Sequence, residues 1–482
     1  MCSYNIGMLL ELFPSLNQNK LIILLNKFFY SIYYLIFIAL LTAISCIFGI
    51  EMYAYYIYIF CGGLFPCLFC KDMTPVFAPL GMAYSSVSLK TNNALEHKSL
   101  FGDRWYHLYI ILALIAAVIL PRLIYELVTK KDVRKYKPYL LVGYLIFGVT
   151  LILGGLTSPY YSKENAIFGL VEFLSLSGCY IILMYIIKWK EMKKDYLFYL
   201  LMFYGLALSI EVFASLILTG GSKVQTGWGI DNNVAGQLCI CISAPMYLAI
   251  KKKFSPIYVF IADFLMLATS LTNSRTGTLF AMVLTLGTFA IAMVKADKKH
   301  RIAILIASLS FAVVFFSLFF IFIDFSKAIY HASVFRDSAK PFLSGRDKIW
   351  RIGFEGLEEN YPFGVGWYYL TGYRSHNFTF RFIPSRYHNT FVQLVASTGV
   401  FGLVAYIYHR YQTIRLTFTK PTLEKTFMFL AISGILLTSI FDCHFFNLGP
   451  GLDYCIILAF IEGVNIKEGI QVKRPFNLKS LI

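Results

Sequence analysis

The sequence has few charged residues for its length. Only 14% of the 482 residues are charged, whereas 58% are hydrophobic. Soluble domains carry roughly a quarter of charged residues, so an ordinary soluble enzyme, a disordered chain and a disulfide-bonded scaffold are all excluded. These proportions predict a polytopic membrane protein built from α-helices.

Acidic residues are scarce beside basic ones. The chain has 26 Asp and Glu residues against 43 Lys and Arg residues, which gives a net charge of +17. No RNA- or DNA-reading motif accompanies this charge, so we expect no nucleic-acid partner. Membrane proteins retain Lys and Arg on their cytoplasmic loops. The excess of basic residues is therefore explained by the orientation of the chain in a bilayer.

The sequence also lacks a convincing metal or redox motif. Most of the ten cysteines stand in apolar runs, as small core residues do. Cys67 and Cys70 form a C-x-x-C pair without a second pair at zinc spacing. Asp442, His444 and Asp453 are spaced too loosely for a metal site. We expect neither a bound metal nor a cofactor.

Apolar segments of about twenty residues, the length that crosses ~30 Å of hydrocarbon, recur along the chain. Residues 52–70 are apolar enough to span, while 73–89 contain Pro75 and Pro79 and suggest a re-entrant segment or a poor helix. We expect about twelve transmembrane helices, or fourteen if both of these segments cross. The first apolar run lacks a small-residue cleavage site and is expected to remain as a span. The twelve predicted spans are 29–50, 106–127, 139–157, 167–187, 196–218, 232–250, 255–273, 276–294, 302–323, 388–408, 426–445 and 450–466.

Basic clusters predict which loops face the cytoplasm. By parity, six clusters fall on one side, and both termini lie on that side as well. The predicted regions are a transmembrane bundle over 1–323, an extracytoplasmic loop over 324–388, transmembrane helices over 389–466 and a basic cytoplasmic tail over 467–482. The six clusters lie in 130–137, 188–194, 251–253, 295–301, 410–425 and 467–474.

The external loop 324–388 contradicts this rule, because it holds nine basic residues and six acidic ones. Within it, apolar residues at three- and four-residue spacing predict an amphipathic helix over 346–360, which Pro362 ends. Such a helix is expected to lie on the outer membrane surface.

Two arginines are candidate phosphate ligands. Arg275 stands at the outer junction of two predicted spans, where an arginine beside hydrocarbon is costly unless it meets an anion or water. Its guanidinium could hold phosphate oxygens, or it could snorkel to the interface. Arg346, at the start of the loop helix, could play the same role or remain solvated.

His388 is the candidate general base, since a histidine can accept a hydroxyl proton near pH 7. It follows Arg386 and precedes Asn389 where the external loop enters a span, a position at which a histidine can also be purely structural. Asn233 stands where another span begins, either as a helix cap or as part of an external cavity.

These pieces, in this order, resemble the O-antigen ligase and polymerase superfamily of bacterial membrane glycosyltransferases. The resemblance covers roughly 225–410 and less than half of the chain. It rests on Asn232-Asn-Val-Ala-Gly236, Ser274-Arg-Thr-Gly277, Arg346-Asp-Lys-Ile-Trp350, Pro362-Phe-Gly-Val-Gly366, and His388-Asn389 followed by Gly399.

The resemblance implies an all-helical fold of the GT-C type and a metal-independent transfer from a lipid diphosphate. Attack opposite the leaving diphosphate predicts inversion at the anomeric carbon. It assigns Arg275 and Arg346 to the diphosphate of undecaprenyl diphosphate and His388 to the acceptor hydroxyl. Asn233, Arg386, Asn389 and Asp442 are supporting candidates. Arg351, Arg374 and Arg386 are alternatives for the second arginine.

The expected function is polymerisation of lipid-linked oligosaccharide repeat units on the outer face of the bacterial cytoplasmic membrane. The partners are then the donor glycan, the acceptor glycan and the bilayer, with a flippase and a chain-length regulator as candidate protein partners. One alternative is an O-antigen ligase that transfers the finished glycan to lipid A core or protein. Another is a lipid-linked oligosaccharide flippase, which should show charged residues within its spans and related halves.

Overall fold

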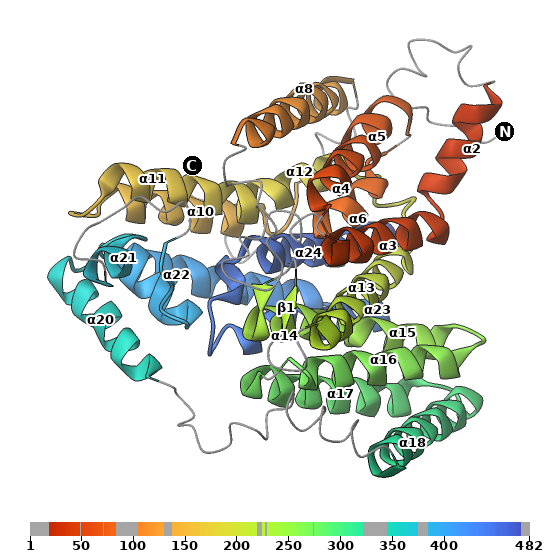
Figure 1. The fold of residues 1–482 in the computed structure, drawn as a ribbon. Coiled ribbons are helices and arrows are strands. Elements are labelled where there is room, and N and C mark those ends of the chain that lie inside the picture. The colour runs from red at the N-terminus through yellow and green to blue at the C-terminus, as the bar shows by residue number, and fades with distance from the viewer. Residues whose placement is uncertain are drawn as a thin grey trace.

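The structure is a computed structural model of the chain (Figure 1). Within the described ranges the regular structure is helical, apart from one short antiparallel hairpin of β1 (Gln225–Thr226) and β2 (Gly229–Ile230). This confirms the all-helical prediction. The described residues are 19–48, 50–70, 72–82, 105–129, 137–218, 224–226, 229–272, 274–321, 345–374 and 384–473.

The N-terminal half contains a broken series of short helices followed by longer ones. The elements are α2 (Lys20–Phe29), α3 (Ile32–Phe48), α4 (Glu51–Tyr58), η2 (Ile59–Leu64), α5 (Phe65–Phe69), η3 (Thr74–Val76), α6 (Phe77–Met82), α8 (Trp105–Thr129), α10 (Leu141–Leu156), α11 (Ser162–Phe173), η4 (Leu174–Gly178), α12 (Cys179–Ile186) and α13 (Tyr196–Leu218).

The C-terminal half places its long helices roughly side by side, and α20 stands at an angle beside the end of α22 (Figure 1). The elements are α14 (Asp231–Cys241), α15 (Ser243–Lys251), α16 (Ser255–Ser270), α17 (Arg275–Lys295), α18 (Lys298–Ile321), α20 (Arg346–Glu359), α21 (Tyr369–Arg374), α22 (Thr390–Phe418), α23 (Leu423–Thr438), η6 (His444–Phe446) and α24 (Leu448–Glu468).

Each of the twelve predicted spans coincides with a helix or a run of helices. Seven candidate membrane spans occur in the described part, and the bent pair α2–α3 would make eight. The other four predicted spans, near α8, α10, α16 and α23, are helical but are not among these candidates. The chain is thus a polytopic membrane protein, with fewer candidate spans than the sequence predicted. The seven are Lys163–Ile186, Tyr196–Leu218, Asn233–Lys251, Arg275–Lys295, Lys298–Ser317, Thr390–Phe418 and Gly449–Glu468.

The ambiguous region 52–89 forms α4, η2, α5, η3 and α6 as far as Met82, and the remainder lies outside the described residues. Pro66 and Pro75 stand in the first turns of α5 and η3, where a missing N–H is tolerated. α6 is almost entirely buried. This region therefore forms short helices, as Pro75 and Pro79 suggested, and its last helix packs inside the protein.

One end of the bundle collects basic residues, and we call it the basic end. Lys194 pairs with Glu468 and Lys252 with Asp195. His300 Nε2 lies 3.2 Å from the carbonyl oxygen of Lys252. These contacts join the turns after α12, α15 and α17 to the last turn of α24, which confirms that four of the predicted basic clusters share one end. Residues 130–136 and those after 473 lie outside the described residues.

Arg410 is an exception to the expected basic cluster 410–425. Its guanidinium lies among the rings of Tyr406, Phe445 and Tyr454, at 4.4–4.6 Å from their centroids. All three of its side-chain nitrogens are buried. Arg410 is therefore an interior cation held by aromatic faces rather than a loop charge.

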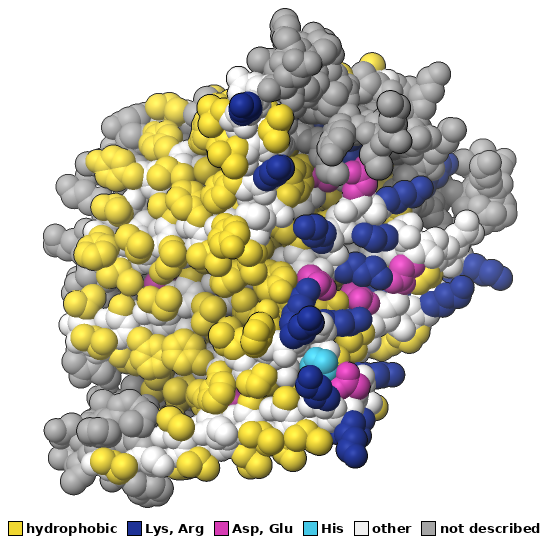
Figure 2. All heavy atoms as spheres, turned by 90° about the vertical axis from the view of Figure 1, so that its right-hand side faces the viewer, with side chains coloured by type: hydrophobic (Ala, Val, Ile, Leu, Met, Phe, Trp, Pro, Cys, Tyr) yellow, Lys and Arg dark blue, Asp and Glu magenta, His cyan; other side chains and the backbone are white. Residues whose placement is uncertain are grey.

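The outer surface of the bundle is apolar over a broad area. Figure 2 shows a face on which hydrophobic side chains predominate, with lysine and arginine side chains gathered along one margin. Exposed apolar side chains include Leu279, Val283 and Leu286 on α17 and Ile306 and Leu309 on α18. Exposed side chains of this kind in a contiguous area are expected where lipid surrounds a protein.

The opposite end of the bundle, which we call the loop end, is assembled from distant segments. The backbone N–H of Thr390 donates to the carbonyl of Ser439 at 2.9 Å. Asn447 Nδ2 lies 3.3 Å from Asn233 Oδ1. The starts of α14 and α22 and the segment 439–447 between α23 and α24 therefore meet there, and the candidate site residues lie on them.

Candidate active site

His388 and Asp442 meet at the loop end. His388 Nδ1 lies 3.3 Å from Asp442 Oδ1. The His388 side chain is 40% exposed and that of Asp442 is 12% exposed. The histidine can therefore reach a ligand, while the carboxylate lies behind it. Both residues are candidates from the sequence, but only the family resemblance gives a reason to place them together.

The backbone holds His388 in an unusual conformation. Its φ is +53°, a region that costs energy for a residue with a Cβ. The N–H of Tyr387, before it, donates to Gln393 Oε1 at 3.2 Å. Asn389, after it, caps α22 by accepting from the N–H of Val392 at 3.0 Å, and its Nδ2 donates to the carbonyl of Ile440. Asn389 therefore acts as a helix cap that also ties the histidine turn to the Asp442 segment.

Asp442 is held in its ionised form. Burial alone would raise the pKa of Asp442, but the hydrogen bond with His388 and the nearby His444 lower it below its ordinary value. The N–H of Cys443 also donates to Asp442 Oδ1 at 2.8 Å. A carboxylate in this position can orient the His388 ring and stabilise a positive charge on it.

Arg386 is buried against a different partner. Its Nη2 lies 3.3 Å from Glu172 Oε1 and donates to the carbonyl of Phe446 at 2.9 Å. Its guanidinium also covers the ring of Phe168 at 5.1 Å. Arg386 therefore links α11 and η6 two residues before His388. This arrangement favours a positioning role over the alternative of the second diphosphate ligand.

Arg275 begins α17, where Ser274 caps the helix by accepting from the N–H of Gly277 at 3.2 Å. A Cβ on Gly277 would clash with Ala235 of α14, so only glycine permits this approach. Further along α17, Phe280 stacks on Phe441 with ring centroids 6.2 Å apart. Because Phe441 precedes Asp442, these contacts place the start of α17 at the same end as His388 and Asp442.

Asn233 lies in the first turn of α14, beside Asn447. One turn further on, a Cβ on Gly236 would lie 2.5 Å from the ring of His444. The Asn-Asn-x-Ala-Gly motif thus provides two close approaches, Ala235 to α17 and Gly236 to His444. Both bring α14 against the elements that carry Arg275 and Asp442.

Arg346 begins α20, after Gly345 with a φ of +80°. The observed bounds confirm the helix predicted over 346–360. Within the described part of the chain, no hydrogen bond or ion pair joins Arg346 to His388 or Asp442. Of the alternatives, Arg351 pairs with Glu355 on α20, and the side chain of Arg374 lies outside the described residues.

The apolar face of α20 packs on protein. Ile349, Trp350 and Ile352 contact a buried cluster of Leu370, Tyr387, Val392 and Ala396. A Cβ on Gly353 would lie 3.0 Å from the Tyr387 ring. The helix predicted to rest on the membrane surface is therefore seated against the residue before His388.

The Pro-Phe-Gly-x-Gly motif docks on the break in α22. Gly399 has a φ of +67°, and the N–H of Val400 donates to the carbonyl of Pro362 at 2.9 Å. The N–H of Val365 donates to the carbonyl of Ala396 at 2.7 Å. The motif and Gly399 are thus two halves of one structural joint rather than a ligand-binding turn.

Two residues that no sequence pattern singled out, Ser158 and Asn165, anchor the segment 365–368. Asn165 Oδ1 accepts from the N–H of Trp367 at 2.5 Å and of Tyr368 at 2.8 Å. Ser158 Oγ donates to the carbonyl of Val365 at 2.5 Å. Glu172 and Gln393 could have been predicted as site residues, because each is an isolated polar residue in a predicted span and such residues are costly in a bilayer. Ser158 and Asn165 could not.

Among the described residues, no group of three His, Cys, Asp or Glu side chains is arranged to hold a metal ion. Asp442 and His444 lie near each other, whereas Asp453 lies within α24, where Gly81 of α6 approaches it.

Comparison with known proteins identifies the region that carries these residues. A family model described as O-antigen ligase matches residues 259–407. This range runs from within α16 to within α22 and includes Arg275, Arg346 and His388, but neither Asn233 nor Asp442. None of the curated proteins compared with the chain matches it. Over residues 259–407 this membrane protein is therefore similar to the O-antigen ligase family, whose members act in polysaccharide synthesis.

Proposed function

We propose that this protein is a glycosyltransferase that polymerises oligosaccharide repeat units carried on undecaprenyl diphosphate. The observation that carries the proposal is the contact between the accessible His388 and the buried Asp442, at the end of the bundle where α17 begins with Arg275. The family match supports an enzyme of this general kind.

His388 is the general base of the proposed reaction. Asp442 faces Nδ1, so a proton on Nδ1 would be hydrogen-bonded to the carboxylate and the lone pair of Nε2 would be free. Nε2 then accepts the proton of the acceptor hydroxyl, and Asp442 stabilises the resulting imidazolium. General base catalysis of this type contributes roughly a hundred- to ten-thousandfold in rate.

The bond changes balance without a further reactant. The acceptor oxygen forms a bond to the anomeric carbon of the donor as its proton passes to His388. The bond from that carbon to the diphosphate oxygen breaks, and its electron pair leaves with the diphosphate. Because attack occurs opposite the leaving group, the configuration at the anomeric carbon inverts.

Arg275 neutralises the charge that develops on the diphosphate. It stands in the first turn of α17, where backbone N–H groups and the helix dipole also favour an anion. Loss of one preorganised donor of this kind typically costs about a hundred- to a thousandfold in rate. We propose Arg346 as the second arginine, since it begins α20, the helix seated against Tyr387.

The proposal places the loop end on the outer face of the cytoplasmic membrane and both termini inside. The basic residues gathered at the other end support this orientation through the preference of Lys and Arg for the cytoplasm. The bundle is then a fold of the GT-C type. A flippase would supply the donor at this face, and a chain-length regulator is a further candidate partner.

The test is a reaction in purified components. The full chain in lipid nanodiscs receives undecaprenyl-diphosphate repeat units, with and without EDTA, and glycan length is measured on gels. We expect polymer from the parent in EDTA, loss of at least about a hundredfold in rate for His388→Ala, and a similar loss for Arg275→Ala that Arg275→Lys restores in part.

A second His–Asp pair provides the matched control. His300 Nδ1 lies 2.9 Å from Asp297 Oδ1, but at the basic end. His300→Ala should therefore polymerise like the parent. Full activity of His388→Ala would refute the proposed base. Transfer of one glycan to lipid A core without polymer would identify a ligase, and movement of lipid-linked glycan across the bilayer without a new bond would identify a flippase.

A further inference from the structure

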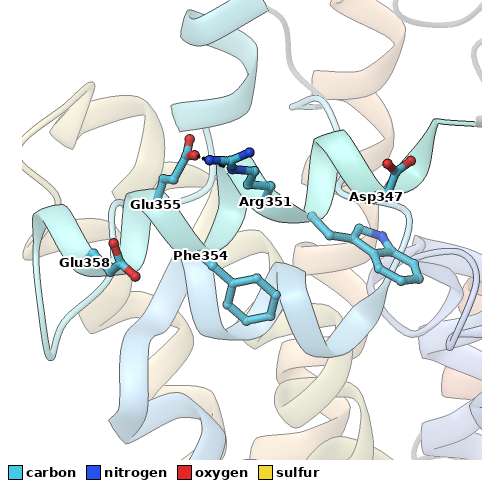
Figure 3. Close-up of a pocket in the computed structure, with 6 residues that line it drawn as sticks. Asp347, Arg351, Phe354, Glu355 and Glu358 are labelled. Atoms are coloured by element: carbon cyan, nitrogen blue, oxygen red, sulfur yellow. Dashed lines mark hydrogen bonds and ion pairs between the residues drawn. The ribbon is translucent and has the colours of Figure 1, made fainter.

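An open groove runs along α20, on a side of the helix that the proposed reaction does not use. Its volume is about 480 Å³. The residues that line it recur at intervals of three and four, so they form one stripe along the helix (Figure 3). They are Asp347, Trp350, Arg351, Phe354, Glu355 and Glu358.

The lining combines aromatic rings with carboxylates. Phe354 is 42% exposed, and Trp350 is partly buried in the cluster beneath it. Asp347, Glu355 and Glu358 supply hydrogen-bond acceptors along the same stripe, and all three are exposed. Pockets of about 300–1,000 Å³ that join aromatic surface to a few polar groups are the usual sites for small ligands.

The charge of the groove disfavours anionic ligands. Three carboxylates stand against one guanidinium, and Arg351 Nε is already paired with Glu355 Oε1 at 3.0 Å. An anionic lipid headgroup or a diphosphate would be repelled by the remaining negative charge. A ligand with hydroxyl donors and an apolar face would instead match both the carboxylates and the rings.

The groove is connected to the proposed base by packing. Trp350 lines the groove and also contacts the buried cluster that contains Tyr387. Tyr387 directly precedes His388. The groove and the residue before His388 therefore belong to one packed unit.

We propose that the α20 groove binds a pyranose unit of the glycan substrate, at a distance from the diphosphate. This rests on the proposed function for the identity of the substrate. The ring of Phe354 stacks on the C–H face of the sugar, Trp350 closes one side, and Glu355 and Glu358 accept hydrogen bonds from its hydroxyls. Arg275 thus binds the diphosphate and the α20 groove binds a sugar of the same lipid-linked glycan.

The experiment measures binding rather than turnover. The probe is the repeat-unit oligosaccharide of the cell that encodes the protein, released from its lipid diphosphate by mild acid and labelled at the reducing end with 2-aminobenzamide. It is titrated with the full chain in nanodiscs, and fluorescence anisotropy gives the dissociation constant. Loss of one stacking ring should weaken binding about tenfold.

The variants separate recognition from folding. Phe354→Ala and Glu358→Gln should each weaken binding, whereas Phe354→Tyr should keep it because the ring remains. Lys348→Ala, at an exposed position of α20 outside the groove, is the matched control. Parent-like affinity of Glu358→Gln and Phe354→Ala, or failure of the parent to bind the probe, overturns the proposal. If Phe354→Ala does not fold, Glu358→Gln decides.

The same titration distinguishes this inference from the proposed reaction. His388→Ala should bind the probe like the parent while it forms no polymer. Binding that the groove variants leave unchanged, together with a catalytic loss in His388→Ala, would refute the groove alone. Groove-dependent binding together with full activity of His388→Ala would refute the proposed base alone.

Discussion

At the scale of single residues, the ionised state of Asp442 predicts a pH dependence. Burial alone would raise the pKa of this carboxyl, but His388 and His444 lower it below its ordinary value of about 3.9. The ionised carboxylate therefore contributes stability above that ordinary pKa, and this contribution is lost as the pH falls through the lowered value. Asp442→Asn should therefore unfold at a lower temperature than the parent at about pH 5.

That margin should shrink when the pH falls below about 4. The measurement is thermal unfolding of both proteins in the same detergent across this pH range. Asp297→Asn, at the exposed His–Asp pair of the basic end, is the comparison. A margin that grows as the pH falls below about 4 would show that the pKa of Asp442 is raised rather than lowered.

Arg386 and Glu172 form a second residue-scale test. Their side chains are 12% and 6% exposed, so removal of Arg386 leaves a carboxylate without its charge partner inside the protein. Breaking a buried ion pair typically costs about 3–5 kcal/mol. We expect Arg386→Met to lower the unfolding temperature strongly and Arg386→Met with Glu172→Gln to recover much of it.

Kinetics assign the role of Arg386. A positioning residue acts through His388, so the double variant should lose kcat while KM for the lipid-linked substrate changes little. If Arg386 binds the diphosphate, its removal should instead raise KM. The added Glu172→Gln substitution should then not return KM to the parent value. An unfolding temperature of Arg386→Met equal to that of the parent would show that the pair does not stabilise the loop end.

At the scale of elements, the joint between Gly399 and the Pro-Phe-Gly-x-Gly turn should be intolerant of side chains. A Cβ on Gly399 would overlap the carbonyl oxygen of Pro362, and the positive φ is unfavourable for alanine in any case. Gly399→Ala should therefore lower the unfolding temperature. It should also reduce activity, because the turn joins α20 to α21.

Gly287 of α17 provides the control for this substitution. A Cβ there would meet nothing within 4 Å, and alanine is favoured over glycine in a helix by about 1 kcal/mol. Gly287→Ala should leave stability equal or slightly higher. Equal unfolding temperatures for Gly399→Ala and the parent would mean that the turn and the break in α22 do not form one joint.

The elements were more predictable than their contacts. Apolar length placed a helix in every predicted span, and three- and four-residue spacing located α20 within one residue at its end. By contrast, His388 and Asp442 are 54 positions apart, and Gly364 and Gly399 belong to different elements. No local pattern encodes such pairs, because they depend on how the helices cross. The aromatic enclosure of Arg410 was hidden for the same reason.

At the scale of the whole molecule, the two ends differ in what their charges do. At the basic end, lysines pair across turns with Asp195 and Glu468 near the surface. At the loop end, Arg386 is buried, and the carboxylates of α20 line a groove. A membrane protein with this asymmetry should insert in a single orientation, with the lysine-rich turns in the cytoplasm.

Cysteine labelling in intact cells tests that sidedness. Glu358→Cys on α20 should react with a membrane-impermeant maleimide added outside, and Lys299→Cys at the start of α18 should react only after permeabilisation. The described native cysteines are buried except for partly buried Cys179, so the parent should label weakly and serve as the control. Labelling of Lys299→Cys from outside, with Glu358→Cys protected, would reverse the orientation. It would also place His388 on the cytoplasmic face, where a reaction on the outer leaflet could not use it.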